Sequence, residues 1–128
     1  MSDNLLMCIG DGDNIGDVID FYLLSQNLEE ASKFSFQVKA AIEHIAELAK
    51  NEINASVVYV AGDDICFIVS NDLNITDILT IYSEYFLKTT GKTMSFGVGK
   101  TSVEALISLR KAKVSGKGRV INFGGNQD

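Results

Sequence analysis

The pattern of apolar and polar residues in the first half of the chain predicts one strand followed by two helices. Residues 5–10, LLMCIG, form a short continuous apolar run, long enough for a buried strand. Residues 15–25 are apolar at near-helical spacing, and Asn14 precedes them as a cap. Residues 28–53 repeat an apolar side chain every three or four positions, which predicts a long amphipathic helix.

Two segments in the middle of the chain predict a hairpin. Residues 56–61 and 65–69 are rich in Val, Ile, Tyr and Phe, as strands are. Gly62 and Asp63 between them fit a tight turn with glycine first. Both segments are apolar on both faces, so we expect two central strands with both sides covered.

The rest of the chain completes an alternating order. The remaining segments are a helix over 74–88 capped by Asn74, a strand over 93–99, a helix over 105–114 after a capping box of Thr101 and Glu104, and a strand over 119–123. The order is β-α-α-β-β-α-β-α-β. It predicts a ferredoxin-like α+β fold, with helices on an antiparallel sheet. A chain of 128 residues makes one such domain, residues 1–128, and we expect the tail after Asn122 to fray.

Composition excludes several classes of protein. Apolar residues make up 46% of the chain, but no apolar run approaches the roughly 20 residues of a membrane span. The N-terminus has no basic segment of the kind that begins a signal peptide. Cys8 and Cys66 lack metal-binding spacing, so we expect two buried thiols in a reducing cytoplasm. A net charge of −6 disfavours binding of a long nucleic acid, and we expect no direct contact with a membrane.

Three aspartates stand where strands end. Asp11 follows the first strand, and Asp63 and Asp64 lie in the hairpin turn. In a ferredoxin-like sheet the first and third strands are neighbours, so these carboxylates should converge. Side chains of consecutive strand residues alternate, so we expect Asp63 and Asp64 to point to opposite sides. Unpaired, the three charges would repel one another, and divalent cations would relieve this repulsion. The arrangement suits two ions about 3.5–4 Å apart, as in phosphoryl transfer.

Two other motifs resemble ion or phosphate sites. Residues 11–22 start like a calcium loop, but Ile15 and Tyr22 replace the ligands at positions five and twelve. GVGKTS, residues 97–102, resembles a phosphate-binding loop, but Met94 replaces the first glycine of that pattern. A loop of that kind would make Lys100 essential.

Taken together, the motifs resemble those of palm-type nucleotide cyclases and polymerases. AGDDICF, residues 61–67, is similar to the GGDD or GGDEF turn of diguanylate cyclases and type III CRISPR polymerases, and DGDNIG, residues 11–16, to their first metal-binding strand end. Residues 95–120 resemble the tail of diguanylate cyclases. The match covers nearly the whole chain and little more, which resembles the minimal CRISPR polymerases (mCpol), stand-alone palms linked to antiphage defence.

The resemblance implies a set of site residues. Asp63 and Asp64 are the expected catalytic residues, and the expected ligands of Mg²⁺ or Mn²⁺ are Asp11, Asp63, Asp64 and the carbonyl of Gly12. The expected nucleotide-binding residues are Gly12, the backbone amides of Asp13, Asn14, Ile15 and Gly16, Gly62, and the cations Lys113 and Lys117. Ile19 falls at or near the position at which diguanylate cyclases read guanine with an asparagine. An apolar side chain cannot do so, which favours adenine.

The resemblance also implies an activity. We expect an enzyme that joins nucleoside triphosphates, ATP in particular, into a cyclic dinucleotide such as cyclic di-AMP, with release of pyrophosphate. Two palms would face each other in a homodimer, and a separate effector would sense the product. Both 3′,5′ and 2′,5′ linkages fit, as does more than one ring size. The alternatives are a degenerate palm that only senses nucleotides, and a cyclase that makes a cyclic mononucleotide.

Overall fold

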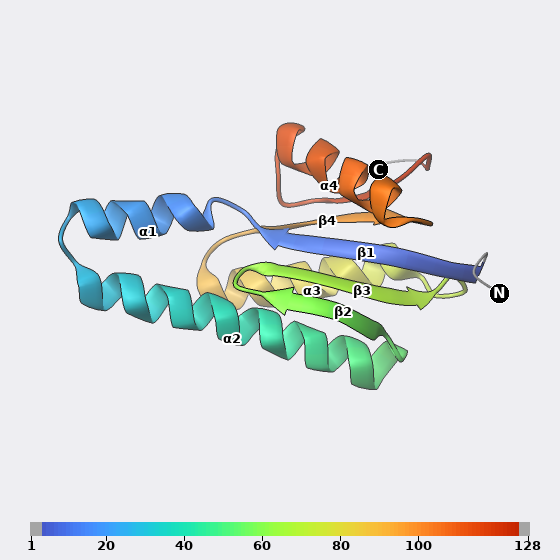
Figure 1. Cartoon of the computed structure of the whole chain (residues 1–128), viewed down its shortest axis with the longest axis horizontal. Helices are drawn as coiled ribbons and strands as arrows, with labels where there is room; N and C mark the ends of the chain where they lie inside the picture. Colours follow the sequence, from blue (N-terminus) through green and yellow to red (C-terminus); the bar gives the residue numbers. More distant parts are fainter. Residues whose placement is uncertain (1–3, 126–128) are drawn as a thin grey trace.

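The computed structural model describes residues 4–125 as a five-stranded sheet with four helices, an α+β fold as predicted (Figure 1). In chain order the elements are β1 (Leu5–Gly12), α1 (Ile15–Leu24), α2 (Leu28–Ile53), β2 (Ser56–Ala61), β3 (Asp64–Ser70), α3 (Ile75–Thr90), β4 (Met94–Gly99), α4 (Ser102–Val114) and β5 (Val120–Asn122). This order confirms the predicted one.

The sheet has the strand order β2-β3-β1-β4-β5. The pairs β2–β3, β3–β1 and β1–β4 are antiparallel. The pair β4–β5 is parallel, because α4 carries the chain back along the sheet before β5 begins. The sheet is therefore mixed, which corrects the prediction of an antiparallel sheet at this one edge.

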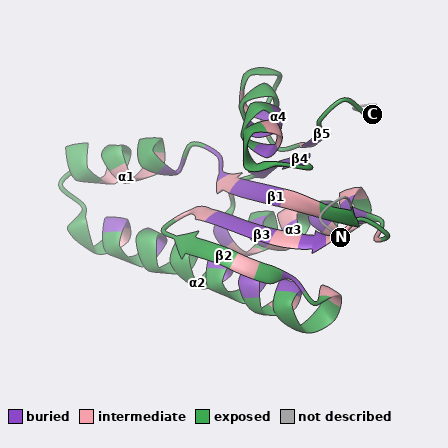
Figure 2. Cartoon of the chain, turned by 45° about the vertical axis from the view of Figure 1, so that its right-hand side comes forward, coloured by how far each residue is buried: buried purple, intermediate pink, exposed green. Residues whose placement is uncertain are grey.

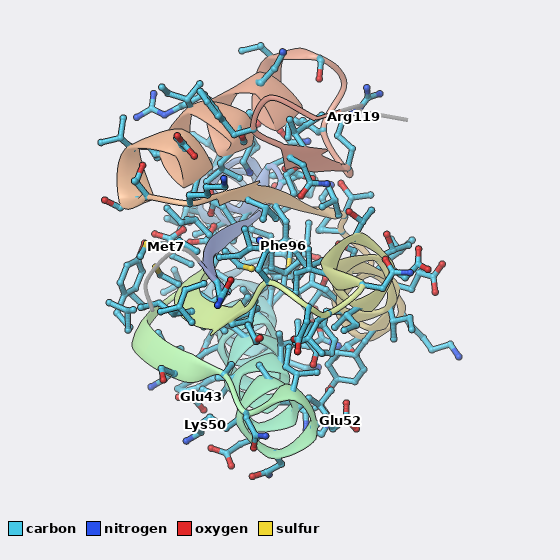
Figure 3. All side chains as sticks on the ribbon, turned by 90° about the vertical axis from the view of Figure 1, so that its right-hand side faces the viewer. Met7, Glu43, Lys50, Glu52, Phe96 and Arg119 are labelled. Carbon is cyan, nitrogen blue, oxygen red and sulfur yellow. The ribbon has the colours of Figure 1, made fainter. Side chains whose placement is uncertain are left out.

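Helices cover the two faces of the sheet unequally. The larger core lies between the sheet and helices α2 and α3, and includes Phe67, Phe86 and Phe96. A smaller core on the other face contains Ile9 and Leu109 under α4. Figure 3 labels Phe96 from the first core and Met7, which packs against the second. Helix α4 lies over β4, β1 and β5, so β3 and β2 extend beyond it on that face.

The prediction of two central strands holds for β3, although α4 leaves part of one of its faces uncovered, and is wrong for β2. Strand β2 forms one edge of the sheet, and most of its residues are exposed (Figure 2). Val57 and Val60 face a shallow pocket beside α2, whereas Tyr59 faces the side of the sheet that α4 leaves uncovered. Pairing with β3 is irregular between Val57 and Tyr59. An apolar strand can thus lie at an edge when only one of its faces has a covering helix.

Helix α4 sits directly on the backbone of β4. A Cβ atom at Gly97 would lie 2.2 Å from the carbonyl oxygen of Ala105 and from the amide nitrogen of Leu109. Glycine therefore serves close helix–strand packing here.

Two predictions concerning single residues can be compared with the structure. The cysteines are free and buried, as expected. Asn14 and Asn74 precede their helices, as predicted, but neither side chain caps an amide.

The predicted fraying of the tail falls largely on residues outside the described range. Within residues 4–125, no helix is both long and apolar enough to cross a bilayer.

Candidate metal and nucleotide site

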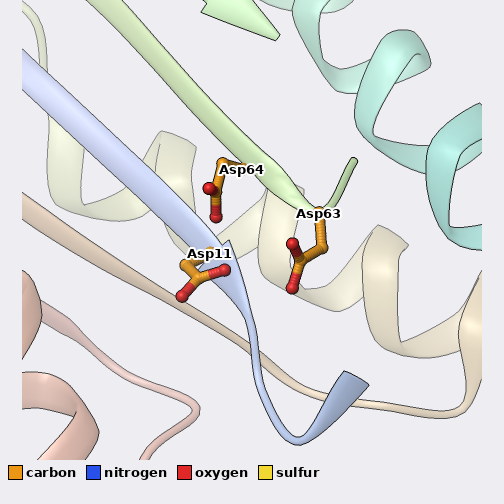
Figure 4. A group of neighbouring side chains, drawn as sticks. All are labelled: Asp11, Asp63 and Asp64. Carbon is orange, nitrogen blue, oxygen red and sulfur yellow. The ribbon is translucent and has the colours of Figure 1, made fainter. Parts of the chain in front are cut away.

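The three predicted aspartates meet at one end of the central strands. Asp11 and Asp64 are direct partners in the antiparallel pairing of β1 with β3. The amide of Gly12 donates to the carbonyl oxygen of Asp63 at 3.0 Å, which fixes the turn against the end of β1. One carboxylate oxygen from each aspartate lies within 4.8 Å of the others (Figure 4). The predicted convergence is thus confirmed.

The expectation that Asp63 and Asp64 point to opposite sides is wrong. Asp64 begins β3, but Asp63 belongs to the two-residue turn, where strand alternation does not apply. Gly62 starts this turn with φ +49°, a left-handed conformation that suits glycine. The turn therefore directs both acids toward Asp11.

The electrostatics of this cluster favour a bound cation. Burial, a hydrogen bond with Asp64 and the charge of that residue raise the pKa of Asp11 to about 6, against the lowering effect of Lys113. Burial and the charge of Asp11 also raise the pKa of Asp63. Three carboxylates at this spacing offer the oxygen ligands that Mg²⁺ and Mn²⁺ prefer. The donor set therefore fits the divalent ions expected from the sequence.

Lys113 lies beside the cluster and acts as its internal cation. Its Nζ donates to the carbonyl oxygens of Asp11 and Gly12 at 3.3 and 3.0 Å. The same atom is 3.3 Å from a carboxylate oxygen of Asp11. The carbonyl of Gly12, predicted as a metal ligand, therefore accepts from an ammonium group in this structure. Lys113 would have to shift if that oxygen were to bind a metal ion.

Asp13 has a role that the sequence did not reveal. Its carboxylate is fully buried and accepts hydrogen bonds from Thr93 Oγ1 at 2.7 Å, Ser95 Oγ at 2.9 Å and the amide of Gly118 at 2.9 Å. Lys113 Nζ completes the set at 2.7 Å. Burial alone would raise the pKa of Asp13, but the hydrogen bonds from Lys113, Thr93 and Ser95 lower it.

These contacts correct one predicted role of Asp13. Its amide was expected to bind phosphate, but it donates to the carbonyl oxygen of Thr93 at 2.9 Å. The polar residues Thr93 and Ser95 in an otherwise apolar segment were the one signal in the sequence that a buried polar partner lay opposite.

The start of α1 keeps the other predicted phosphate contacts together. Ile15 and Gly16 are its first two residues, and amides in the first turn of a helix have no acceptor within that helix. Asn14 precedes them in a left-handed conformation, φ 60°, and its Oδ1 accepts from Lys117 Nζ at 2.5 Å. Lys117, which the family resemblance implied as a nucleotide-binding cation, thus lies beside the helix start.

A small pocket adjoins the turn on the side of α1 and α2. It has a volume of about 190 Å³, and Gly62 and Asp63 form one wall. Ile15 and Ile19 contribute an apolar wall from α1, and Ser35 and Lys39 of α2 also line it. Ile19, predicted to stand where guanine is read in diguanylate cyclases, therefore faces a pocket next to the acidic cluster.

The two competing motifs do not form their sites. Residues 11–22 are a strand end and a helix, so they do not form a calcium loop. At the start of α4 the carboxylate of Glu104 accepts from the amide of Lys100 at 2.9 Å, where a phosphate-binding loop would hold phosphate. Gly99, the last residue of β4, pairs with Met7 of β1, whereas Asp11 pairs with Ser95. The motif at residues 97–102 therefore lies away from the acidic cluster. Thr101 Oγ1 accepts from the amide of Glu104 at 3.1 Å, which confirms one half of the predicted capping box, whereas the Glu104 carboxylate accepts from Lys100 and not from Thr101.

Known proteins with the same fold include two classes of palm domain. The family model described as mCpol, minimal CRISPR polymerase domain, matches residues 7–123. The GGDEF domain of DgcB from Caulobacter crescentus, solved with c-di-GMP, superposes with a TM-score of 0.66 at 14% identity, over 95% of this chain and 79% of that one. A GGEEF domain of a diguanylate cyclase from Vibrio cholerae gives 0.67 at 15% identity, over 97% and 86%.

The second class comes from CRISPR complexes. A Csm1–Csm4 cassette solved with cA4 gives a TM-score of 0.67 at 22% identity, over 91% of this chain but 20% of that one. The chain therefore spans about a fifth of the length of this neighbour. No curated protein matches the chain.

Proposed function

The chain belongs to the family of minimal CRISPR polymerase domains (mCpol), and on that basis we propose that it is a cyclic oligonucleotide synthase. It would join two nucleoside triphosphates, ATP in particular, into a cyclic dinucleotide of the cyclic di-AMP type. The observation that carries this proposal is the convergence of three carboxylates, from Asp11, Asp63 and Asp64, at one end of β1 and β3.

Each bond formed in this reaction links a ribose hydroxyl oxygen to an α-phosphorus atom. The bond from that phosphorus to the β-phosphate bridging oxygen breaks, pyrophosphate leaves, and the hydroxyl proton passes to solvent. Bound Mg²⁺ or Mn²⁺ would activate the attacking hydroxyl and stabilise the charge on the leaving oxygen.

The residues of the chain would hold these groups in place. Asp11, Asp63 and Asp64 supply the oxygen ligands, and the amides of Ile15 and Gly16 are placed to bind phosphate oxygens.

Lys113 and Lys117 supply positive charge beside the segment that joins β1 to α1. Lys113 contacts the carbonyl of Gly12, and Lys117 contacts Asn14. On nucleotide binding, each ammonium group could exchange these oxygens for phosphate oxygens.

The proposed preference for ATP rests on the pocket beside Gly62. Ile19 offers no hydrogen-bonding group to the guanine edge, whereas an apolar wall suits the flat face of adenine. The structural neighbours contain different bases: Csm1–Csm4 cassettes are solved with one ATP and with cA4, and DgcB is solved with c-di-GMP. The apolar residue at position 19 supports the proposal of adenine.

The proposed assembly is a homodimer. One palm holds one donor triphosphate, so a cyclic dinucleotide needs a second palm whose nucleotide faces the first. The two-fold axis would pass the edge formed by Asp11 and Gly62. The product would act in the cytoplasm as a second messenger for a separate effector in antiphage defence.

The test is to incubate the purified chain with each of the four triphosphates and Mg²⁺, and to identify products by mass spectrometry. We expect a cyclic dinucleotide from ATP, none in EDTA, and none from Asp64→Asn. The matched control Asp20→Asn removes the same charge from the exposed side of α1 and should keep activity.

The other possible products separate the rival functions. A pure cyclic di-GMP product would overturn the adenine preference. A cyclic mononucleotide would overturn the two-palm reaction. Tight nucleotide binding with no product under any condition would identify a sensor.

A further inference from the structure

A second, larger groove touches the same acidic cluster from the opposite side. It lies between α4 and the part of β3 and β2 that α4 leaves uncovered, and its volume is about 480 Å³. Asp11 and Asp64 close one end of it. The smaller pocket beside Gly62 instead touches Asp63. The three carboxylates thus lie between two cavities. The proposed function assigns a ligand only to the smaller cavity.

The lining of this groove combines the features that bind a nucleotide. Ile9 and Leu109 give it an apolar floor, and Tyr59 of β2 adds an aromatic ring that is 42% exposed. Burial, Cys66 and the charges of Asp64 and Asp11 raise the pKa of the Tyr59 hydroxyl. The ring therefore lies within electrostatic reach of the acidic cluster.

Helix α4 supplies the cations of the groove. Lys113 stands at the acidic end, and Arg110, one turn earlier, also lines the groove. Within the described residues Arg110 is exposed and forms no ion pair, unlike Lys113. A free guanidinium group beside an apolar floor suits a phosphate whose base and sugar lie on that floor.

The outer side of α4 is also unusually apolar. Ala105, Leu109 and Ala112 face the sheet, yet Leu106 is 44% exposed and Val114 is 85% exposed. An ordinary surface helix is polar on its outer side. Both exposed residues line the groove, which is expected if a ligand covers them during the reaction.

We propose that this groove binds the acceptor nucleotide, whose ribose hydroxyl attacks the α-phosphate. The base would stack on Tyr59 beside Leu106, and Arg110 would bind the acceptor phosphate. This inference rests on the proposed function. In an in-line displacement the nucleophile and the leaving group lie on opposite sides of phosphorus, and the two cavities lie on opposite sides of the carboxylates.

The same arrangement serves the dimer. In the dimer, each palm would keep the base of its donor nucleotide in the pocket beside Gly62 and take the acceptor nucleotide in its groove. The first transfer would give the linear dinucleotide pppApA, and in the second its free ribose hydroxyl would attack the α-phosphorus of its own triphosphate. In each transfer the new bond joins the ribose oxygen to phosphorus, and pyrophosphate leaves toward the start of α1.

AMP provides a direct test, because it has a ribose hydroxyl but no pyrophosphate to lose, and so can act as an acceptor only. With ATP as donor, it should yield the linear dinucleotide pApA, measured by mass spectrometry. In Tyr59→Ala and Arg110→Ala, the AMP concentration for half-maximal pApA should rise at least about tenfold. That corresponds to about 1.4 kcal/mol, within the range of base–aromatic stacking.

Two controls separate the acceptor groove from the donor site. Lys111→Ala removes a charge from an exposed position of α4 outside the groove and should leave the dependence on AMP unchanged. Binding of α,β-methylene-ATP with Mg²⁺, measured by calorimetry, should be the same in Tyr59→Ala, Arg110→Ala and the wild type at a concentration at which all are monomeric. This second measurement requires no turnover.

Each other outcome has a definite meaning. If the wild-type chain makes no product from ATP, the proposed function fails. If it makes cyclic product but both groove variants keep the wild-type dependence on AMP, the acceptor inference alone is overturned. If Tyr59→Ala and Arg110→Ala instead weaken dimerisation in sedimentation and leave the dependence on AMP unchanged, the groove is a protein interface, and the inference is likewise overturned.

Discussion

Replacing Asp11 by asparagine should make the metal-free protein more stable at neutral pH. The change keeps the shape of the side chain and removes one charge from the carboxylate cluster. In the folded chain the pKa of Asp11 is raised from 3.8 to about 6, mainly by burial and by Asp64. The folded state therefore holds this proton more tightly than the unfolded state does.

The magnitude follows from proton linkage. A raised carboxyl pKa contributes stability that is fully present below pH 3.8 and is lost as pH rises through about 6. The shift of about two units corresponds to an upper limit of about 3 kcal/mol. The side chain of Asp11 is 29% exposed, so we take about half of that, roughly 1.5 kcal/mol, to allow for solvent screening. The midpoint of thermal unfolding should rise by about 5–7 °C for a chain of this size.

The assay compares the wild type, Asp11→Asn and the control Asp20→Asn in EDTA, by thermal and urea unfolding at pH 4.5, 6.0 and 7.5. The advantage of Asp11→Asn should be small at pH 4.5 and largest at pH 7.5, whereas Asp20→Asn should follow the wild type. Adding Mg²⁺ should stabilise the wild type and largely close the gap, because the ion binds only the intact cluster.

Two results would refute this reasoning. If Asp11→Asn is less stable than the wild type at pH 7.5, the attraction of Lys113 outweighs the repulsion within the cluster. If its advantage is the same at all three pH values, the gain has a cause other than the proton on Asp11.

Four further predictions test the site and the fold. Asp63→Asn and Asp64→Asn should each abolish product formation while melting curves still show a folded chain; full turnover in both would place the metal site elsewhere. Lys100→Ala should keep wild-type turnover, since Glu104 occupies the amide of Lys100 at the start of α4; a large loss of turnover would support a phosphate-binding loop. Turnover per subunit should rise with enzyme concentration in the dilute range, and a constant value down to concentrations where sedimentation shows only monomer would contradict the dimer. Gly97→Ala should destabilise the chain by about 1–3 kcal/mol or more in urea unfolding, because its Cβ would lie 2.2 Å from the backbone of α4; wild-type stability would contradict the close packing.

The parts of the fold that the sequence predicted depend on local periodicity. The bounds of α2, residues 28–53, follow from the spacing of its apolar residues, and the turn at Gly62 follows from residue type. The meeting of Asp11 with Asp64 followed from the order of elements, since that order makes β1 and β3 neighbours.

The parts that the sequence did not predict depend on contacts between distant segments. Whether an apolar strand is central or at an edge depends on which strands pair, so β2 was misplaced. The parallel direction of β5 depends on the path of α4 across the sheet. The burial of Asp13 arises only when Ser95 and Gly118 come to it from other elements. A charged residue after a strand otherwise looks like any surface turn.

The long reach of the Asp13 contacts has a consequence for synthesis of the protein. Asp13 and Gly118 are 105 positions apart, and Lys113 lies 100 positions from Asp13. Because translation proceeds from the N-terminus, the carboxylate leaves the ribosome long before the groups that compensate its burial. A nascent palm that ends before Lys113 would have all three acids of the cluster but no counter-charge for them. Interrupted translation should therefore yield fragments that do not fold stably, so that the complete site forms only in chains that have been translated past residue 118.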